Sequence, residues 1–139
     1  MTPESARGTP SLVAFIGAVA LGGAIGAVLR WLVELSTVAL LDAEPVATLI
    51  VNILGCFAMG VLVARVLGGA VRSALARPFL GTGVLGGFTT FSAYAADAAA
   101  LTRDGAPALA GAYVVGTLAV CLVAVWAGGW MGRVRGVAA

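Results

Sequence analysis

The sequence predicts an all-α membrane protein that crosses the bilayer four times, and this prediction rests on composition and on the spacing of the charges. Of the 139 residues, 61% are hydrophobic and only 10% are charged, whereas a soluble domain carries about 25% charged residues. Backbone groups in lipid must be paired within their own segment, so helices are the natural crossing structure. Four charge-free stretches are each long enough for a helical crossing, which takes about 20 residues: 8–29, 45–64, 78–96 and 105–132.

These stretches predict a single integral membrane domain over residues 1–139. A small-residue triplet, Ala18-Val19-Ala20, would suit a cleaved signal peptide, but the apolar run continues past it. The chain has no histidine, no nucleophile–base pattern and no phosphate-binding loop, so we do not expect an enzyme. The predicted spans are approximately residues 12–33, 46–66, 78–97 and 106–131.

Arginines are distributed unequally between the two ends of the predicted bundle. Arg30 and Arg103 belong to one side, and the other side carries three times as many. Because cytoplasmic loops carry an excess of Lys and Arg, this bias favours both termini in the cytoplasm. The arginines of the richer side are Arg7, Arg65, Arg72, Arg77, Arg133 and Arg135.

The first span carries two glycines one helical turn apart, followed by an arginine. Gly22 and Gly26 would let another helix approach the backbone closely. Arg30 would cost about 3 kcal/mol at the centre of the bilayer, so we expect it near a mouth or in a wet cavity. It can serve there as a snorkelling anchor or as a vestibule charge that attracts anions.

The second span contains one strongly polar residue, Asn52, with Thr48 one turn earlier on the same face. Gly55 and Gly60 follow and suit close helix packing. An amide offers two N–H donors without a net charge, which suits an ion that must bind briefly and then leave. Asn52 can equally serve as a hydrogen bond between helices.

The third span changes character midway along its length. Glycines come first and a hydroxyl and aromatic cluster, Thr89-Thr90-Phe91-Ser92, follows them. Glycines and hydroxyl side chains both weaken a helix, so we predict a break over residues 86–92, near the bilayer midplane. Broken helices at that depth line ion sites. The glycines are Gly81, Gly83, Gly86 and Gly87.

The fourth span places Tyr113, Thr117 and Cys121 in one stripe, because residues four apart share a helix face. The stripe could flank an ion path or bond to neighbouring helices. Cys121 and Cys56 both fall inside apolar spans, where we expect small buried hydrophobic residues rather than a disulfide or a metal pair. No span centre carries a carboxylate, which disfavours proton-coupled transport.

Three of these patterns together closely resemble the Fluc (CrcB) fluoride channels. Their order, their placement one to a span and the chain length agree with that family, and the resemblance covers essentially residues 12–132. The patterns are Gly22-Gly23-x-x-Gly26-Ala27-x-x-Arg30, Asn52-x-x-Gly55-x-Phe57-x-x-Gly60 and Gly86-Gly87-Phe88-Thr89-Thr90-Phe91-Ser92.

The resemblance implies an antiparallel dimer of four-helix subunits with two fluoride pores and a structural sodium ion (Na+) at the dimer centre. It implies that sodium is bound by the backbone carbonyls of Gly86 and Thr89, and that Arg30 is the family's basic residue. Tyr94 departs from the phenylalanine that is more usual at its position. The implied fluoride path consists of the amide of Asn52, the aromatic pair Phe91 and Tyr94, and a polar track of Ser92, Tyr113 and Thr117.

We therefore expect a fluoride-selective channel for passive export that lowers cytoplasmic fluoride, in a plasma membrane of the bacterial type. Its partners would be fluoride, membrane lipid and a second subunit, either an identical antiparallel chain or an oppositely oriented paralogue. A small four-helix multidrug or cation transporter is the first alternative, although it should carry an intramembrane glutamate. A non-transporting scaffold subunit is the second, although it would leave Asn52 and the broken span unexplained.

Overall fold

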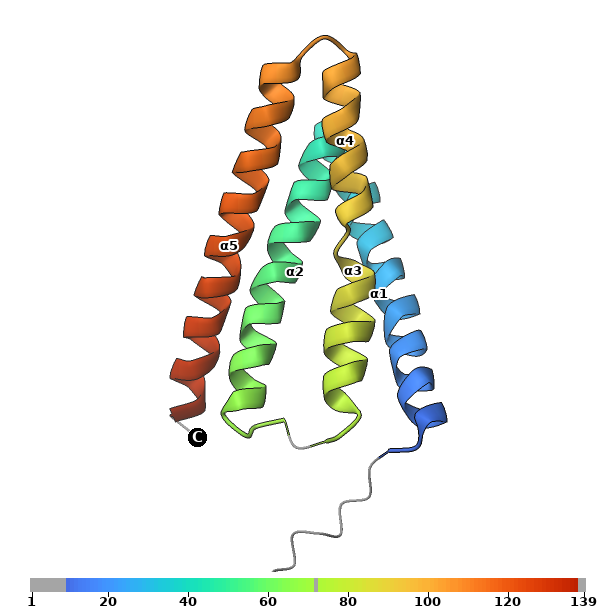
Figure 1. The fold of residues 1–139 in the computed structure, drawn as a ribbon, viewed down its shortest axis with the longest axis vertical. Helices are drawn as coiled ribbons and strands as arrows, with labels where there is room; N and C mark the ends of the chain where they lie inside the picture. Colours follow the sequence, from blue (N-terminus) through green and yellow to red (C-terminus); the bar gives the residue numbers. More distant parts are fainter. Residues whose placement is uncertain (1–9, 72, 138–139) are drawn as a thin grey trace, which may run out of the picture.

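Helices form nearly all of the part of the chain that the computed structural model describes, residues 10–71 and 73–137 (Figure 1). No β-strand occurs within those residues, which confirms the all-α prediction. Arg7 and Arg72 lie outside the described residues, as does the side chain of Arg135. The elements in chain order are α1 (Leu12–Leu41), α2 (Glu44–Leu67), η2 (Pro78–Leu85), α3 (Gly86–Phe88), α4 (Phe91–Arg103) and α5 (Pro107–Val137).

Among the described helices, α1, α2 and α5 are each long and apolar enough to cross a membrane. The remaining crossing is divided among η2, α3 and α4, which follow one another along the bundle (Figure 1). Four crossings therefore fit the structure. Helix α1 runs beyond its charge-free stretch and includes Arg30 and Glu34, because nothing in that sequence stops a helix before Asp42.

Local chemistry explains where the helices begin and turn. The Ser11 hydroxyl caps α1 by accepting a hydrogen bond from the Ala14 N–H at 3.2 Å. Helix α1 ends at Asp42, whose positive φ of 49° turns the chain toward α2. Pro45 occupies the first turn of α2, where a missing N–H leaves no helical bond unmade. Gly105, with a φ of 79°, makes the turn from α4 to α5.

The helices pack chiefly as two pairs, α1 against η2 and α3, and α2 against α5 (Figure 1). A side chain at Gly22 would collide with the Phe79 carbonyl, and one at Gly26 with the Val84 carbonyl. The backbones of α1 and its partner are therefore in direct contact. Lipid is as apolar as the side chains, so this close packing supplies the attraction that the hydrophobic effect supplies in water.

Helices α2 and α5 run in the same direction and keep one register, with four pairs of residues at successive turns. Contacts place Thr48 against Tyr113 and Cys56 against Cys121, and Gly60 against the Val125 carbonyl. The same register puts Asn52 and Thr117 at one level. We call this interface the α2–α5 seam, and its pairs from the loop end onward are Thr48–Tyr113, Asn52–Thr117, Cys56–Cys121 and Gly60–Val125.

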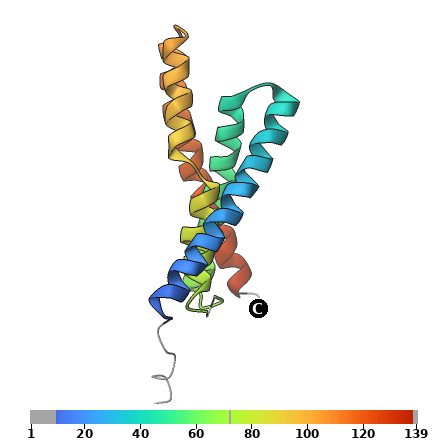
Figure 2. The ribbon, with the colours of Figure 1, turned by 90° about the vertical axis from the view of Figure 1, so that its right-hand side faces the viewer.

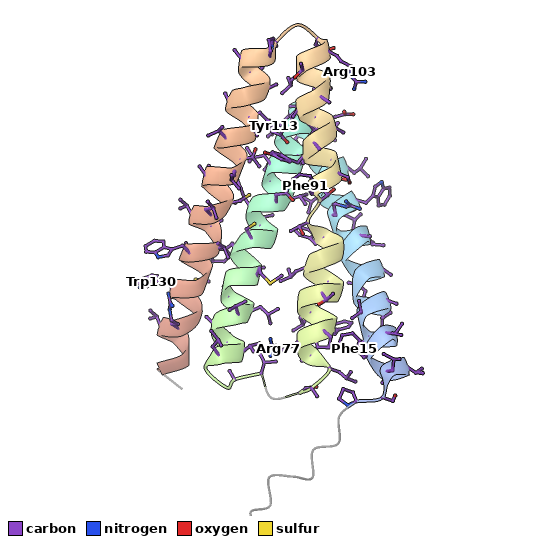
Figure 3. All side chains as sticks on the ribbon, in the orientation of Figure 1. Phe15, Arg77, Phe91, Arg103, Tyr113 and Trp130 are labelled. Atoms are coloured by element: carbon purple, nitrogen blue, oxygen red, sulfur yellow. The ribbon has the colours of Figure 1, made fainter. Side chains whose placement is uncertain are left out.

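The two helical hairpins diverge from one another toward their loops, as a view from the side shows (Figure 2). Side chains that are fully buried are small, with Val51 and Ala47 among the most enclosed. Large apolar side chains lie on the outside: Trp126 is 69% exposed, and Trp130 points away from the bundle (Figure 3). This distribution suits a protein whose surroundings are lipid rather than water.

The third crossing changes backbone geometry along its length. Pro78–Leu85 is a π-helix and Gly86–Phe88 is one α-helical turn. Thr89 and Thr90 are then extended, with ψ of 154° and 123°, before α4 begins at Phe91. The glycines that precede Thr89 are thus helical, and the extended residues are the two threonines. The depth of this segment in a bilayer stays a prediction.

Candidate functional site

Asn52 holds the extended segment of the third crossing in place. Its Nδ2 donates to the Thr90 carbonyl at 3.0 Å, and its Oδ1 accepts from the Thr90 N–H at 3.0 Å. The Asn52 side chain is only 9% exposed. A residue outside a helix needs partners for both backbone groups when it is buried, and this single amide supplies both. One of the two amide N–H donors of Asn52 remains for another acceptor.

Gly55 lies one turn from Asn52 and receives the neighbouring threonine. A Cβ at Gly55 would collide with Cγ2 of Thr89. The Thr89 hydroxyl is turned back along its own chain, where it donates to the Leu85 carbonyl at 2.9 Å. Asn52 and Gly55 together form the surface of α2 that contacts the two extended threonines. This contact explains the Asn52-x-x-Gly55 spacing in structural terms.

The Thr90 side chain restarts the helix after the interruption. Its Oγ1 accepts from the Ala93 N–H at 3.2 Å, the usual bond of a helix N-cap. The same Oγ1 lies 3.1 Å from Oγ of Ser92, and either hydroxyl can be the donor. Ser92 is exposed, so the two hydroxyls lead from Thr90, whose backbone Asn52 binds, to the outside of the subunit.

Three aromatic rings follow in line from this hydroxyl chain. The centroids of Phe91 and Tyr94 are 5.6 Å apart, and those of Tyr94 and Tyr113 are also 5.6 Å apart. The Tyr94 hydroxyl donates to the Val114 carbonyl on α5 at 3.0 Å. The hydroxyl that distinguishes Tyr94 from a phenylalanine is therefore used to join α4 to α5. Figure 3 shows Phe91 and Tyr113 at neighbouring levels of the bundle.

A carboxylate that the sequence analysis left aside belongs to the same cluster. The Tyr113 hydroxyl donates to Oδ2 of Asp97 at 3.1 Å, and the Thr48 side chain is also near it. The donor of Tyr113 is thus engaged within the subunit. In the sequence Asp97 stands at the end of the third span, away from the polar residues of the other spans. Only the fold brings Tyr113 next to it. A possible signal was the spacing of Phe91, Tyr94 and Asp97, which share one face of α4.

Thr117 is the one member of the predicted polar track with nothing to bond. It is 6% exposed, and no hydrogen-bond partner for its Oγ1 is found among the described residues. The register of the α2–α5 seam puts it at the level of Asn52. Buried hydroxyls in proteins nearly always have a partner, and an exception calls for a bound water or ion.

The remaining predicted residues lie at the edge of this cluster or away from it. Phe91 is 79% exposed and Gly86 is also exposed. Both therefore lie on the surface of the subunit, where lipid or another chain would contact them. Arg30 is half-buried on α1, and the described contacts do not join it to the cluster. Gly22, Gly26 and Gly60 take part in helix packing.

The backbone around the two threonines offers oxygens of the kind that sodium binds. The Thr90 N–H, which would bond to the Gly86 carbonyl in a continuous helix, is used by Asn52. The Gly86 carbonyl therefore lacks its usual helical donor, and the extended conformation of Thr89 releases its carbonyl as well. Hard cations prefer such oxygen ligands. In the described part of the chain, no cluster of three or more His, Cys, Asp or Glu side chains offers another metal site.

Taken together, the fold and the cluster define a small multi-pass membrane protein with a polar cluster at the interruption of its third crossing. Amide and hydroxyl groups and aromatic rings make up the cluster, and the carboxylate of Asp97 lies at one side of it. The chain belongs to the CrcB-like family: the family model described as "CrcB-like protein, Camphor Resistance (CrcB)" matches residues 17–129. This confirms the resemblance that the three sequence patterns indicated.

Similar proteins carry the name fluoride-specific ion channel. FluC of Cereibacter sphaeroides is 48% identical over 119 residues, which cover 85% of this chain and 92% of that protein. FluC of Paracoccus denitrificans is 49% identical over 115 residues, or 83% of this chain and 91% of that protein. FluC 2 of Nocardia farcinica is 42% identical over 120 residues, or 86% of each.

Family membership also confirms two broader expectations, that the chain is not an enzyme and that it lies in the plasma membrane. The family consists of ion channels, so the chain is not an enzyme. Together with the long apolar helices, membership identifies a multi-pass protein of the plasma membrane. The roles of individual residues stay predictions that the geometry supports to different degrees.

Proposed function

We propose that this chain is a subunit of a fluoride-selective channel that exports fluoride passively and so lowers its cytoplasmic concentration. Family membership and the names of the similar proteins support the choice of ion. Fluoride is small and strongly hydrated, so a path for it needs several fixed donors in place of water. The cluster around Asn52 is the part of the described structure that supplies them.

The single observation that carries this proposal is the buried, unpartnered hydroxyl of Thr117. A hydroxyl can donate to an anion, and the second N–H of Asn52 lies at the same level of the α2–α5 seam. Neither group carries a charge that would hold an anion permanently. An ion that passes between them would satisfy both groups for a moment and then move on.

Phe91 and Ser92 extend the proposed path to the outside of the subunit. The edge of an aromatic ring is positive and attracts anions weakly, and the Phe91 ring is largely exposed. A path with one side open to lipid would not hold an ion, because lipid offers it no ligands. The exposed Phe91 and Ser92 therefore support a second subunit that closes the path, in a dimer with two pores.

Sodium would lie where the carbonyls of Gly86 and Thr89 are released, on the exposed side of the interruption. Two carbonyls are too few for a hard cation, which takes about six oxygen ligands, so a second chain would have to supply the others. The ion would then hold the two interruptions together at the dimer centre.

Replacing sodium by potassium should lower the unfolding temperature of the purified dimer. An unchanged temperature would remove Gly86 and Thr89 from the proposed site.

The charges at the two ends of the bundle favour a single insertion direction. Arg65, Arg77 and Arg133 lie toward the end of the bundle where α5 finishes. Asp42 and Asp104 lie at the opposite end, where α1 connects to α2 and α4 to α5. Figure 3 places Arg77 and Arg103 at opposite ends. Because the arginine-rich end stays in the cytoplasm, an antiparallel partner would have to be a chain with the opposite bias. We therefore propose a heterodimer.

Protease access to a C-terminal tag tests this orientation. In spheroplasts, which expose only the outer face of the membrane, the tag of every chain should be protected. In inverted membrane vesicles every tag should be cleaved. Cleavage of about half the tags in both preparations would mean that the chain inserts both ways, and the partner would then be a second copy.

Fluoride efflux from liposomes tests the function itself. Purified protein, together with the partner subunit if one co-purifies, is reconstituted with fluoride inside and measured with a fluoride electrode. We expect fast fluoride release and no chloride release above that of protein-free liposomes. Equal release of the two ions, or no release of either from a preparation that contains both subunits, would contradict a fluoride-selective channel.

A further inference from the structure

The α2–α5 seam contains a pair of cysteines that the fluoride path does not use. Cys56 and Cys121 come one turn after Asn52 and Thr117 on the two facing helices, and their thiols are close enough to interact. Both are free and half-buried, and the chain has no other cysteine. The sequence analysis expected small buried hydrophobic residues here rather than a disulfide or a metal pair, and nothing in the sequence shows that α2 and α5 share a register.

The helices that carry the two thiols are held close together. One turn beyond the cysteines, a Cβ at Gly60 would collide with the Val125 carbonyl, and a Cβ at Gly128, one turn further along α5, would collide with the Phe57 carbonyl. Backbone therefore packs on backbone immediately beside the pair. The packing of the two backbones therefore keeps the two cysteines at one level of the seam.

We propose that Cys56 and Cys121 form a binding site for a soft divalent metal ion that prefers two ligands in a line, as Hg²⁺ does. Thiolates select soft metals. Binding breaks two S–H bonds, releases two protons and forms two S–Hg bonds. The product carries no net charge, which matters because an isolated charge is strongly disfavoured in an apolar interior.

The same geometry disfavours other metals. Zinc requires four protein ligands in a structural site, and the described residues offer no group of three or more His, Cys, Asp or Glu side chains. A soft monovalent ion between two thiolates would leave one negative charge inside the bundle. The neutral complex of a divalent ion with two sulfurs avoids both problems.

Retention of mercury against a competing thiol tests the site. The purified protein is treated with one equivalent of HgCl₂ per chain and then dialysed against excess of a monothiol. A pair of protein sulfurs should keep about one mercury per chain, whereas a single sulfur should lose its mercury to the competitor. Elemental analysis of mercury per chain is the readout. Loss of all mercury from the unaltered protein would overturn the proposal.

Matched variants show whether both sulfurs are required. Cys56→Ala and Cys121→Ala should each lose the retained mercury, and either variant keeping it would exclude a bridge between the two. The ultraviolet absorption of a mercury–dithiolate gives a second readout on the unaltered protein, should a variant fail to fold. None of these measurements involves fluoride, so their outcome is independent of the proposed channel activity.

Discussion

The two main helix interfaces of the bundle are built in opposite ways. Helix α1 meets η2 and α3 at several glycines, with Gly22 and Gly26 against carbonyl groups. The α2–α5 seam uses glycines only at its Gly60 end and carries polar side chains and thiols toward the loops. The first interface brings backbone against backbone at these glycines, whereas the second contains the unpartnered Thr117 hydroxyl. Close helix packing and the proposed ion path thus lie in different parts of one small protein.

The largest effect should come from filling the glycine interface. Gly26→Ala puts a methyl group into the Val84 carbonyl, and backbone cannot move aside as a side chain can. We expect a loss of about 3 kcal/mol or more, the upper end for overpacking. Gel filtration and thermal unfolding in detergent measure it. Gly17→Ala is the control, because a Cβ there meets nothing within 4 Å, and equal behaviour of the two variants would contradict the contrast between these positions.

Removing the Asn52 side chain should have the next largest effect. Asn52→Ala leaves both backbone groups of Thr90 buried without partners, and each such group costs about 1–3 kcal/mol. We expect a lower unfolding temperature and loss of fluoride efflux. Ser36→Ala is the control, because its hydroxyl bonds to Leu32 on an exposed helix surface. A variant at Asn52 with unchanged stability would mean that the amide does not hold the extended segment.

The smallest effect should follow from Tyr94→Phe. The change removes the bond to the Val114 carbonyl but keeps the ring against Phe91. A neutral hydrogen bond contributes about 1 kcal/mol, so we expect slightly lower stability and fluoride efflux within about a factor of two. Efflux lost altogether at full stability would show that the Tyr94 hydroxyl is part of the path rather than a link between helices.

The sequence predicted the crossings better than it predicted the contacts of the site. Four crossings follow from charge-free length, because lipid excludes charge wherever it occurs in a span. The glycines of the third span suggested a break that began at Gly86, but they are helical, and the extended residues are Thr89 and Thr90. The threonines are extended because Asn52 can replace their helical bonds, and that contact joins residues far apart in the sequence.

The sequence also did not predict which residues of neighbouring helices lie side by side, because these contacts join residues far apart in the chain. The stripe of Tyr113, Thr117 and Cys121 followed from helical periodicity. Its partners on α2 did not, because periodicity gives the face of a helix and not the neighbour of that face. Asp97 beside Tyr113 and Cys56 beside Cys121 became visible only when α5 was placed against α4 and α2.

The most direct test of whether the ion path follows the α2–α5 seam is fluoride efflux from the Thr117→Val variant. The Thr37→Val variant is its control. Both threonines are buried, and valine keeps the shape while it removes the hydroxyl, but Thr37 lies on α1, outside the seam. A hydrogen bond to a charged group contributes about 1.5–3 kcal/mol, so Thr117→Val should slow efflux about tenfold or more at full stability, and Thr37→Val should leave it unchanged. Unchanged efflux through Thr117→Val, or an equal loss in both variants, would contradict a path along this seam.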